Sequence, residues 1–109
     1  MNILFVCSRN NWRSPTAEKI YKNVSGINAK SAGTEPSARI KINTRLIDWA
    51  EIIFVMEKKH KVRLIEKFPE HLSDTPIIIL DIPDEYKFMD PELIEHIKAS
   101  VSPHLEAGI

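Results

Sequence analysis

The chain of 109 residues has only one cysteine, Cys7. A lone cysteine excludes an intramolecular disulfide framework and a metal site built from several thiolates, and it suits a reducing compartment. The sequence also lacks metal-ligand spacing among its histidines, which are His60, His71, His96 and His104. We interpret these histidines as surface or helix-end residues, and we predict no metal and no other cofactor.

Neither sign of charge is in excess, because 15 Lys and Arg residues balance 15 Asp and Glu residues. A general nucleic-acid-binding protein carries a net basic surface, so the balance speaks against a nucleic-acid partner. No stretch approaches the roughly 18 apolar residues that a membrane-spanning helix needs. The first residues also lack a secretory signal pattern. We therefore expect a cytoplasmic protein that has no membrane partner.

Repeats, low-complexity tracts and linkers are absent as well, so residues 1–109 are predicted to form a single domain. With 43% hydrophobic residues, that domain can bury a core of its own. What the chain does contain is a regular alternation of apolar and amphipathic segments. Strands are predicted over residues 1–6, 27–32, 51–56 and 76–80, and helices over 14–26, 45–50, 58–68 and 91–108.

The alternation of strands and helices predicts an α/β fold with three layers, in which right-handed helical crossovers join parallel strands. The predicted third helix should turn its apolar side chains inward, namely Val62, Leu64, Ile65 and Phe68. In open parallel sheets, ligands bind at the carboxyl ends of the strands, close to the point where the strand order reverses. The loop after the first strand is the usual place, and here that loop holds Cys7.

The loop between the first strand and the first helix has a composition suited to binding an anion. It reads Cys7-Ser8-Arg9-Asn10-Asn11-Trp12-Arg13-Ser14. Consecutive backbone amides in such a loop can surround a phosphate or another oxyanion, and the positive end of the helix dipole adds to the attraction. The same field stabilises a thiolate, which predicts that Cys7 is a nucleophile.

Three side chains of this loop are predicted to support Cys7. The guanidinium fork of Arg13 can bind two oxygens of a phosphoryl group. Ser14, which precedes a proline, is expected to cap the helix and to donate a hydrogen bond to the Cys7 sulfur. Asn10 tolerates the left-handed backbone geometry that a tight cradle needs. We predict that residues 8–14 bind phosphate.

Several segments together resemble a known family. They are Ile3–Cys7, Arg13–Glu18, Ser31–Thr34, Asp48–Met56 and Asp81–Tyr86, spread over nearly the whole chain. In these segments the chain resembles the low-molecular-weight protein tyrosine phosphatases and the arsenate reductases that share their fold. The resemblance implies a flavodoxin-like, four-stranded parallel sheet flanked by helices. It also implies a phosphocysteine intermediate on Cys7, formed from a phosphorylated protein or a small aryl phosphate and hydrolysed by water.

Phosphoryl transfer to Cys7 also needs an acid that protonates the leaving group. Asp84 is the preferred candidate because Asp84-Glu85-Tyr86 resembles the Asp-Pro-Tyr motif of related phosphatases, although Glu85 replaces the proline. Asp81 is the second candidate. Asp90 precedes a proline at a helix start, so it is predicted to cap that helix. Tyr86 is a candidate for lining the pocket.

Two alternatives to a phosphatase stay open. One is an arsenate reductase that borrows a small external thiol, since a relay through several cysteines is excluded. The other is a phosphate- or phosphoprotein-binding module with little turnover, an alternative suggested by Glu85 and by a region between Thr34 and Trp49 that is shorter than in typical relatives. The residues Arg9 and Trp12 also depart from the family pattern, in which a small residue and, in some members, a second cysteine occupy these positions.

Overall fold

A parallel sheet of four strands organises the protein. A computed structural model describes residues 1–108, with side chains described through residue 105. The strand order is β2-β1-β3-β4, and every pairing is parallel. This confirms the predicted α/β fold. The strands are β1 (Asn2–Cys7), β2 (Asn28–Gly33), β3 (Ile52–Val55) and β4 (Ile77–Ile79).

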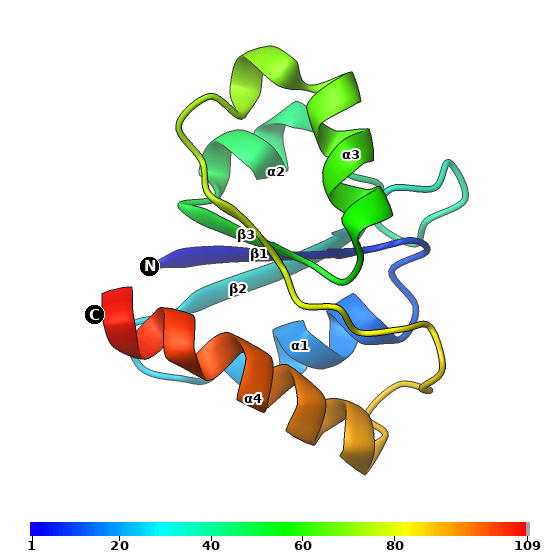
Figure 1. Cartoon of the computed structure of the whole chain (residues 1–109), viewed down its shortest axis with the longest axis vertical. Helices are drawn as coiled ribbons and strands as arrows, with labels where there is room; N and C mark the ends of the chain where they lie inside the picture. Colours follow the sequence, from blue (N-terminus) through cyan, green and yellow to red (C-terminus); the bar gives the residue numbers. More distant parts are fainter. Residues whose placement is uncertain (109) are drawn as a thin grey trace.

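Helices cover both faces of the sheet, so the molecule has three layers. Figure 1 shows α1 and α4 on one face and α2 and α3 on the other. A short 3-10 helix, η1, extends the chain after α3. The bounds are α1 (Arg13–Tyr21), α2 (Thr44–Trp49), α3 (Lys58–Lys67), η1 (Pro69–His71) and α4 (Pro91–Gly108).

The central strand β1 serves two hydrophobic cores at once. Phe5 points into the core under α1 and α4, where its ring stacks on Phe54 with 5.6 Å between centroids. Leu4 and Val6 point the other way, into the core under α2 and α3. Because both faces are covered, the strand is apolar at consecutive positions instead of alternating. The continuous burial of β1 fixes the position of Cys7 at its carboxyl end.

Two predictions about the helices are wrong, one about where the first helix ends and one about the inward face of α3. The first helix ends at Tyr21 because successive tight turns, closed by bonds from Val24 N to Tyr21 O and from Ile27 N to Val24 O, return the chain to β2. On α3 the inward face is His60 and Leu64, whereas Val62 and Ile65 are 42% and 46% exposed. Residues four apart share a helix face, so a helix that buries His60 and Leu64 must turn Val62 outward.

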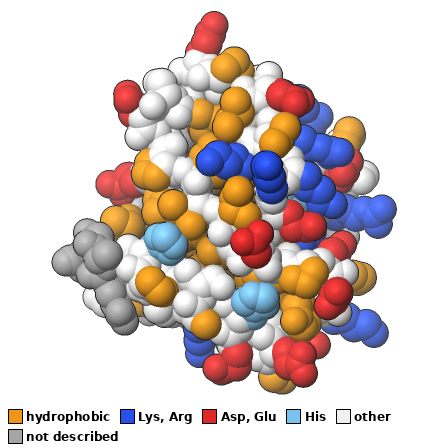
Figure 2. Space-filling model, viewed as in Figure 1, with side chains coloured by type: hydrophobic (Ala, Val, Ile, Leu, Met, Phe, Trp, Pro, Cys, Tyr) orange, Lys and Arg blue, Asp and Glu red, His pale blue; other side chains and the backbone are white. Residues whose placement is uncertain are grey.

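The start of α4 follows the prediction, because the Asp90 carboxylate accepts a hydrogen bond from the backbone N–H of Glu92. The Lys and Arg side chains of α3 lie mostly on its solvent side, and Figure 2 shows blue side chains gathered on the part of the surface where α3 lies. No helix within residues 1–108 is both long and apolar enough to span a bilayer.

Candidate active site

A small cavity opens at the carboxyl end of β1, beside the segment that follows β4. Its volume is about 90 Å³, and its lining residues are Cys7, Ser8, Arg9, Asn11, Trp12, Arg13 and Asp84. Hollows of about 360 to 520 Å³ lie elsewhere on the described surface, but Cys7 lines none of them. The chemistry of the lining residues therefore marks the smaller cavity as the candidate site.

The backbone of the loop is arranged to receive an anion. Within the described part of the chain, no acceptor is hydrogen-bonded to the backbone N–H groups of residues 8–14. The carbonyl groups of the loop, in contrast, are used: Cys7 O, Ser8 O and Arg9 O accept bonds from the N–H groups of residues 34, 35 and 39. The carbonyls thus hold the loop against the 34–39 segment, and the amides remain available to a ligand.

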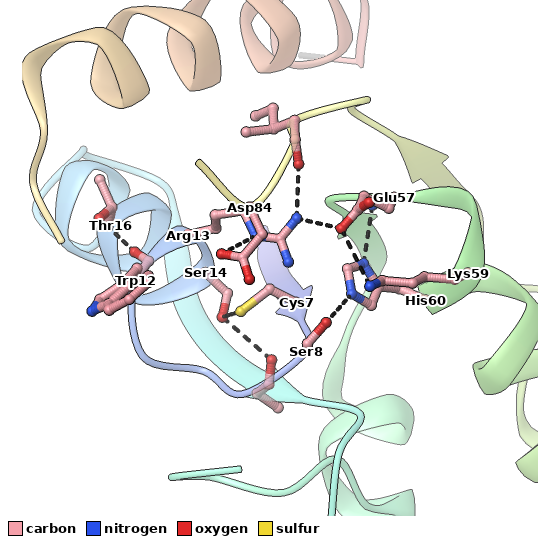
Figure 3. A network of polar contacts seen from close by, with 12 residues as sticks. Cys7, Ser8, Trp12, Arg13, Ser14, Thr16, Glu57, Lys59, His60 and Asp84 are labelled. Carbon is pink, nitrogen blue, oxygen red and sulfur yellow. Dashed lines mark hydrogen bonds and ion pairs between the residues drawn. The ribbon is translucent and has the colours of Figure 1, made fainter. Parts of the chain in front are cut away.

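Cys7 lies at the end of β1 with its sulfur beside a hydroxyl group. The Cys7 side chain is 3% exposed, and its Sγ is 2.9 Å from Ser14 Oγ (Figure 3). Asn10 Nδ2 donates to the same Oγ at 2.8 Å, so the oxygen's acceptor capacity is partly used. The Ser14 proton is then directed to the sulfur or to Ala32 O at 3.3 Å. A thiolate at Cys7 would be a better acceptor than a thiol and would draw this proton.

Asn10 and Ser14 support the loop from inside the protein. Both are completely buried, and neither side chain lines the cavity. Asn10 has a φ of 58°, the left-handed geometry expected for it. Its amide also donates to Ser31 Oγ at 2.9 Å, and the Ser31 hydroxyl donates to the carboxylate of Glu18. This chain of hydrogen bonds ties the loop to β2 and α1.

The predicted helix cap at Ser14 is wrong. The first helical residue is Arg13, Trp12 occupies the cap position, and no side chain caps the N-terminus of α1. The physical reason is the network around the sulfur, which takes the Ser14 hydroxyl into the interior. The helix start is held in another way, because Thr16 Oγ1 donates to the carbonyl of Trp12 at 2.6 Å.

Arg13 is almost completely buried, and its guanidinium group is held on one side. Its Nη1 donates to Glu57 Oε2 at 2.6 Å and to Ile82 O at 2.8 Å. These two contacts fix the plane of the group and leave Nε and Nη2 for other partners. Nε lies 3.7 Å from Asp84 Oδ1, at the mouth of the cavity (Figure 3). A guanidinium held this way presents a preorganised fork to an oxyanion.

Glu57 is a site residue that the sequence interpretation missed. Burial alone would raise its pKa, but the hydrogen bond and the charge of Arg13, followed by the charge of Lys59, outweigh burial and lower the pKa. The carboxylate therefore stays ionised and neutralises the buried Arg13. Its position offered a signal, since Glu57 follows β3 just as Cys7 ends β1, and the ends of parallel strands meet at one sheet edge.

The two candidate acids occupy different places. Asp84 lines the cavity, and its side chain is 56% exposed. Asp81 is exposed, does not line the cavity, and has a φ of 56°. Only Asp84 is thus brought to the loop. Tyr86, expected as a pocket residue, instead packs against the core under α1 and α4 and does not line the cavity.

The outer rim of the cavity carries the exposed side chains of the loop, Arg9, Asn11 and Trp12. All three are exposed, and Trp12 is 45% exposed. They line the cavity together with Ser8, as expected for residues that contact a bound group. The indole of Trp12 offers an apolar surface next to a polar cradle.

Gly33, at the end of β2, allows the loop to approach the sheet. A Cβ at this position would lie 2.5 Å from Ser8 O, 2.7 Å from the Ala38 side chain and 3.0 Å from the backbone of Arg9. Backbone atoms cannot move aside at small cost, so only glycine fits here. The glycine thereby positions the same segment of the loop that carries Cys7.

His60 lies in the first turn of α3, at a helix end as predicted, but its side chain is completely buried and does not lie on the surface. Its Nε2 is 2.9 Å from Ser8 Oγ. His71 is an exposed helix-end residue whose Nδ1 is 2.9 Å from Asp48 Oδ1. Among the residues that the structure describes, no group of three or more His, Cys, Asp or Glu side chains is arranged to hold a metal ion.

Comparisons with known sequences agree with this geometry. Residues 2–51 match the profile described as low molecular weight phosphotyrosine protein phosphatase. A protein-arginine-phosphatase of Geobacillus stearothermophilus is 33% identical over 97 residues, a match that takes in 67% of this chain. The match spans 66% of the length of that relative.

Solved structures show the same fold over nearly the whole chain. An arginine phosphatase from Geobacillus stearothermophilus superposes with a TM-score of 0.70 at 23% identity, covering 98% of this chain and 94% of the other. The tyrosine phosphatase Wzb from Escherichia coli K30, solved in complex with phosphate, gives a TM-score of 0.75 at 20% identity and covers 97% and 96% of the two chains.

Proposed function

The chain belongs to the low molecular weight phosphotyrosine protein phosphatase family, and from this premise we propose that it is a phosphatase that acts through Cys7. One observation carries the proposal. The lone thiol lies in the same small cavity as a buried guanidinium group, a carboxyl group and a run of backbone amides that have no acceptor among the described residues. These are the groups that phosphoryl transfer to a thiolate requires.

In the first step, the Cys7 thiolate attacks phosphorus and forms the S–P bond while the bond to the leaving group breaks. Nε and Nη2 of Arg13, together with the loop amides, neutralise the charge on the equatorial oxygens. Asp84, in its protonated form, gives its proton to the departing atom. The product of this step is a phosphocysteine.

In the second step, water attacks the phosphocysteine, and the Asp84 carboxylate formed in the first step takes the proton from the water. The S–P bond breaks, and its electron pair returns to Cys7. The Ser14 hydroxyl, 2.9 Å from the sulfur, donates a hydrogen bond to the thiolate and improves it as a leaving group. Inorganic phosphate then leaves the cavity, and Cys7 and Asp84 have regained their starting protonation states.

The substrate is a phosphorylated protein side chain or a small aryl phosphate. Phosphotyrosine is the first candidate, because the family is that of the phosphotyrosine phosphatases and Trp12 offers an apolar surface at the rim. Phosphoarginine is the second, favoured by the curated relative that is a protein-arginine-phosphatase. A guanidinium group would also be attracted to the face of Trp12.

Phosphate release from two peptides of the same sequence tests this proposal, one peptide carrying phosphotyrosine and the other phosphoarginine. We expect release from at least one of them, and the ratio of the two kcat/KM values assigns the substrate class. The Cys7→Ser variant serves as the blank. If neither peptide nor an aryl phosphate is hydrolysed but inorganic phosphate still binds, the chain is a binding module and the proposal fails.

Asp84→Asn is expected to lose activity in proportion to the need for a leaving-group proton. For phenyl phosphate, kcat/KM should fall by about 10²- to 10³-fold, whereas for 2,4-dinitrophenyl phosphate it should fall by less than about 10-fold. The parameter kcat/KM is used because it reports the steps through departure of the leaving group.

Asp81→Asn is the matched control for this comparison. It removes the same charge three residues earlier in the same segment, and both kcat/KM values should stay within about 2-fold of the wild type. A leaving-group-dependent loss in Asp81→Asn, with none in Asp84→Asn, would assign the acid to Asp81 instead.

A further inference from the structure

The imidazole of His60 lies directly beneath the catalytic loop and uses both of its nitrogens. The backbone N–H of Glu57 points at Nδ1, with 3.0 Å between the two nitrogens. On the other side of the ring, Nε2 is 2.9 Å from Ser8 Oγ (Figure 3). The side chain is completely buried, so no solvent contact competes with these two bonds.

These contacts determine where the ring proton resides. A backbone N–H can only donate, so Nδ1 must be unprotonated to accept the bond from Glu57. The single proton of a neutral imidazole is then on Nε2. The neutral form is also the stable one, because burial and the charge of Arg13, partly opposed by Glu57, lower the pKa of His60 to about 4.

The tautomer of His60 in turn decides the role of the Ser8 hydroxyl. Because Nε2–H donates, Ser8 Oγ is the acceptor in this bond and its own proton is free to be donated. Ser8 lines the cavity beside Cys7 and Arg13. Within the described residues, the Ser8 hydroxyl makes no hydrogen bond other than the one to His60.

We propose that His60 is a positioning residue, which holds the Ser8 hydroxyl so that its proton is donated to an oxygen of the oxyanion bound in the cavity. The bound group is a phosphate or the phosphoryl group of the substrate, so the inference rests on the proposed function. Ser8 contacts this group directly, and His60 acts only through Ser8. The proposal therefore concerns affinity for an oxyanion, which can be measured without turnover.

A double-mutant cycle on inorganic phosphate binding tests the inference. Measured by calorimetry, the dissociation constant should rise about 10-fold in Ser8→Ala, as expected for losing a hydrogen bond to a charged acceptor. The dissociation constant should rise about 3- to 10-fold in His60→Ala. In the double variant it should stay within about 2-fold of the value for Ser8→Ala, because both substitutions disable the same hydrogen-bond donor. If the effects of the two single substitutions multiply in the double variant, or if His60→Ala leaves the phosphate affinity unchanged, the proposal is overturned.

Leu64→Ala is the control for damage to α3. Leu64 lies one turn further along the helix, is 1% exposed, and does not line the catalytic cavity. This variant should lower the melting temperature, as the loss of a buried leucine does, and leave phosphate affinity within about 2-fold of the wild type. If Leu64→Ala weakens phosphate binding as much as His60→Ala does, the effect comes from helix packing and the proposal fails.

Nitrogen NMR of the imidazole supplies a signature that a packing role would not produce. At neutral pH the His60 ring should be neutral with its proton on Nε2, and adding phosphate to the wild type should shift the Nε2–H resonance. The shift should be absent in Ser8→Ala. A proton on Nδ1 would overturn the proposal. Phosphate binding without hydrolysis of any substrate would instead refute the phosphatase function and leave this inference standing.

Discussion

Cys7→Ser is expected to lower the turnover of an aryl phosphate by at least about 10⁴-fold, the largest effect of any single substitution in this chain. A serine hydroxyl is not ionised near neutral pH and is a much weaker nucleophile than a thiolate. A phosphoserine formed in its place would also release phosphate far more slowly than a phosphocysteine. Steady-state hydrolysis of 4-nitrophenyl phosphate measures the loss.

Phosphate affinity and thermal unfolding are the controls for Cys7→Ser. The loop amides and Arg13 are unchanged in this variant, so inorganic phosphate should still bind. The substitution also keeps a group that can hydrogen-bond to Ser14, 2.9 Å away in the wild type. Residual turnover above about 1% of the wild type would mean that another group is the nucleophile.

Arg13→Lys is expected to lower kcat/KM by about 10³-fold while keeping the positive charge. In the wild type, Nη1 binds Glu57 and Ile82 O, and the remaining edge of the guanidinium stays free. A lysine has one nitrogen, which cannot bind both of these partners and also form two parallel bonds to a phosphoryl group. Much of the loss should appear in kcat, because the charge on the equatorial oxygens is redistributed during transfer.

Arg63→Lys provides the same chemical change at a surface ion pair. Arg63 Nη1 is 2.8 Å from Glu35 Oε1, and both side chains are partly exposed. An exposed pair of this kind contributes about 0 to 1 kcal/mol, so activity should stay within about 2-fold of the wild type. If Arg13→Lys also retains activity within 10-fold of the wild type, bidentate binding by Arg13 is not part of the mechanism.

The arrangement of the loop between β1 and α1 could be anticipated because its signals are local. An apolar strand followed by a cysteine, and a helix start six residues later at Arg13, lie within one short segment. The left-handed φ of Asn10 and the cap at Asp90 are also local preferences, and both are found in the structure. The cap at Ser14 was predicted by the same kind of rule. It failed because the hydroxyl has better partners in the interior, at Cys7 and Asn10.

The side chains that form hydrogen bonds with the loop could not be predicted from residues close to it in the sequence. Glu57 is 44 positions from Arg13 and His60 is 52 positions from Ser8, so only the pairing of β1 with β3 brings them together. The outward orientation of Val62 could not be predicted either, because the face of α3 that packs inward depends on the side chains on the facing surface of the sheet. A histidine in a charged helix has the appearance of a surface residue until that packing is known.

By itself, the sequence determined the order of strands and helices, the three-layer fold and the segment that carries Cys7 and Arg13, because burial patterns and turn chemistry act over a few residues. Only the tertiary structure decided which carboxyl group lies in the cavity, that Glu57 neutralises Arg13, and that His60 reaches Ser8. These choices depend on strand register and on how closely the backbones approach, as Gly33 shows. Both quantities arise from contacts between segments far apart in the chain, so local residue preferences do not encode them.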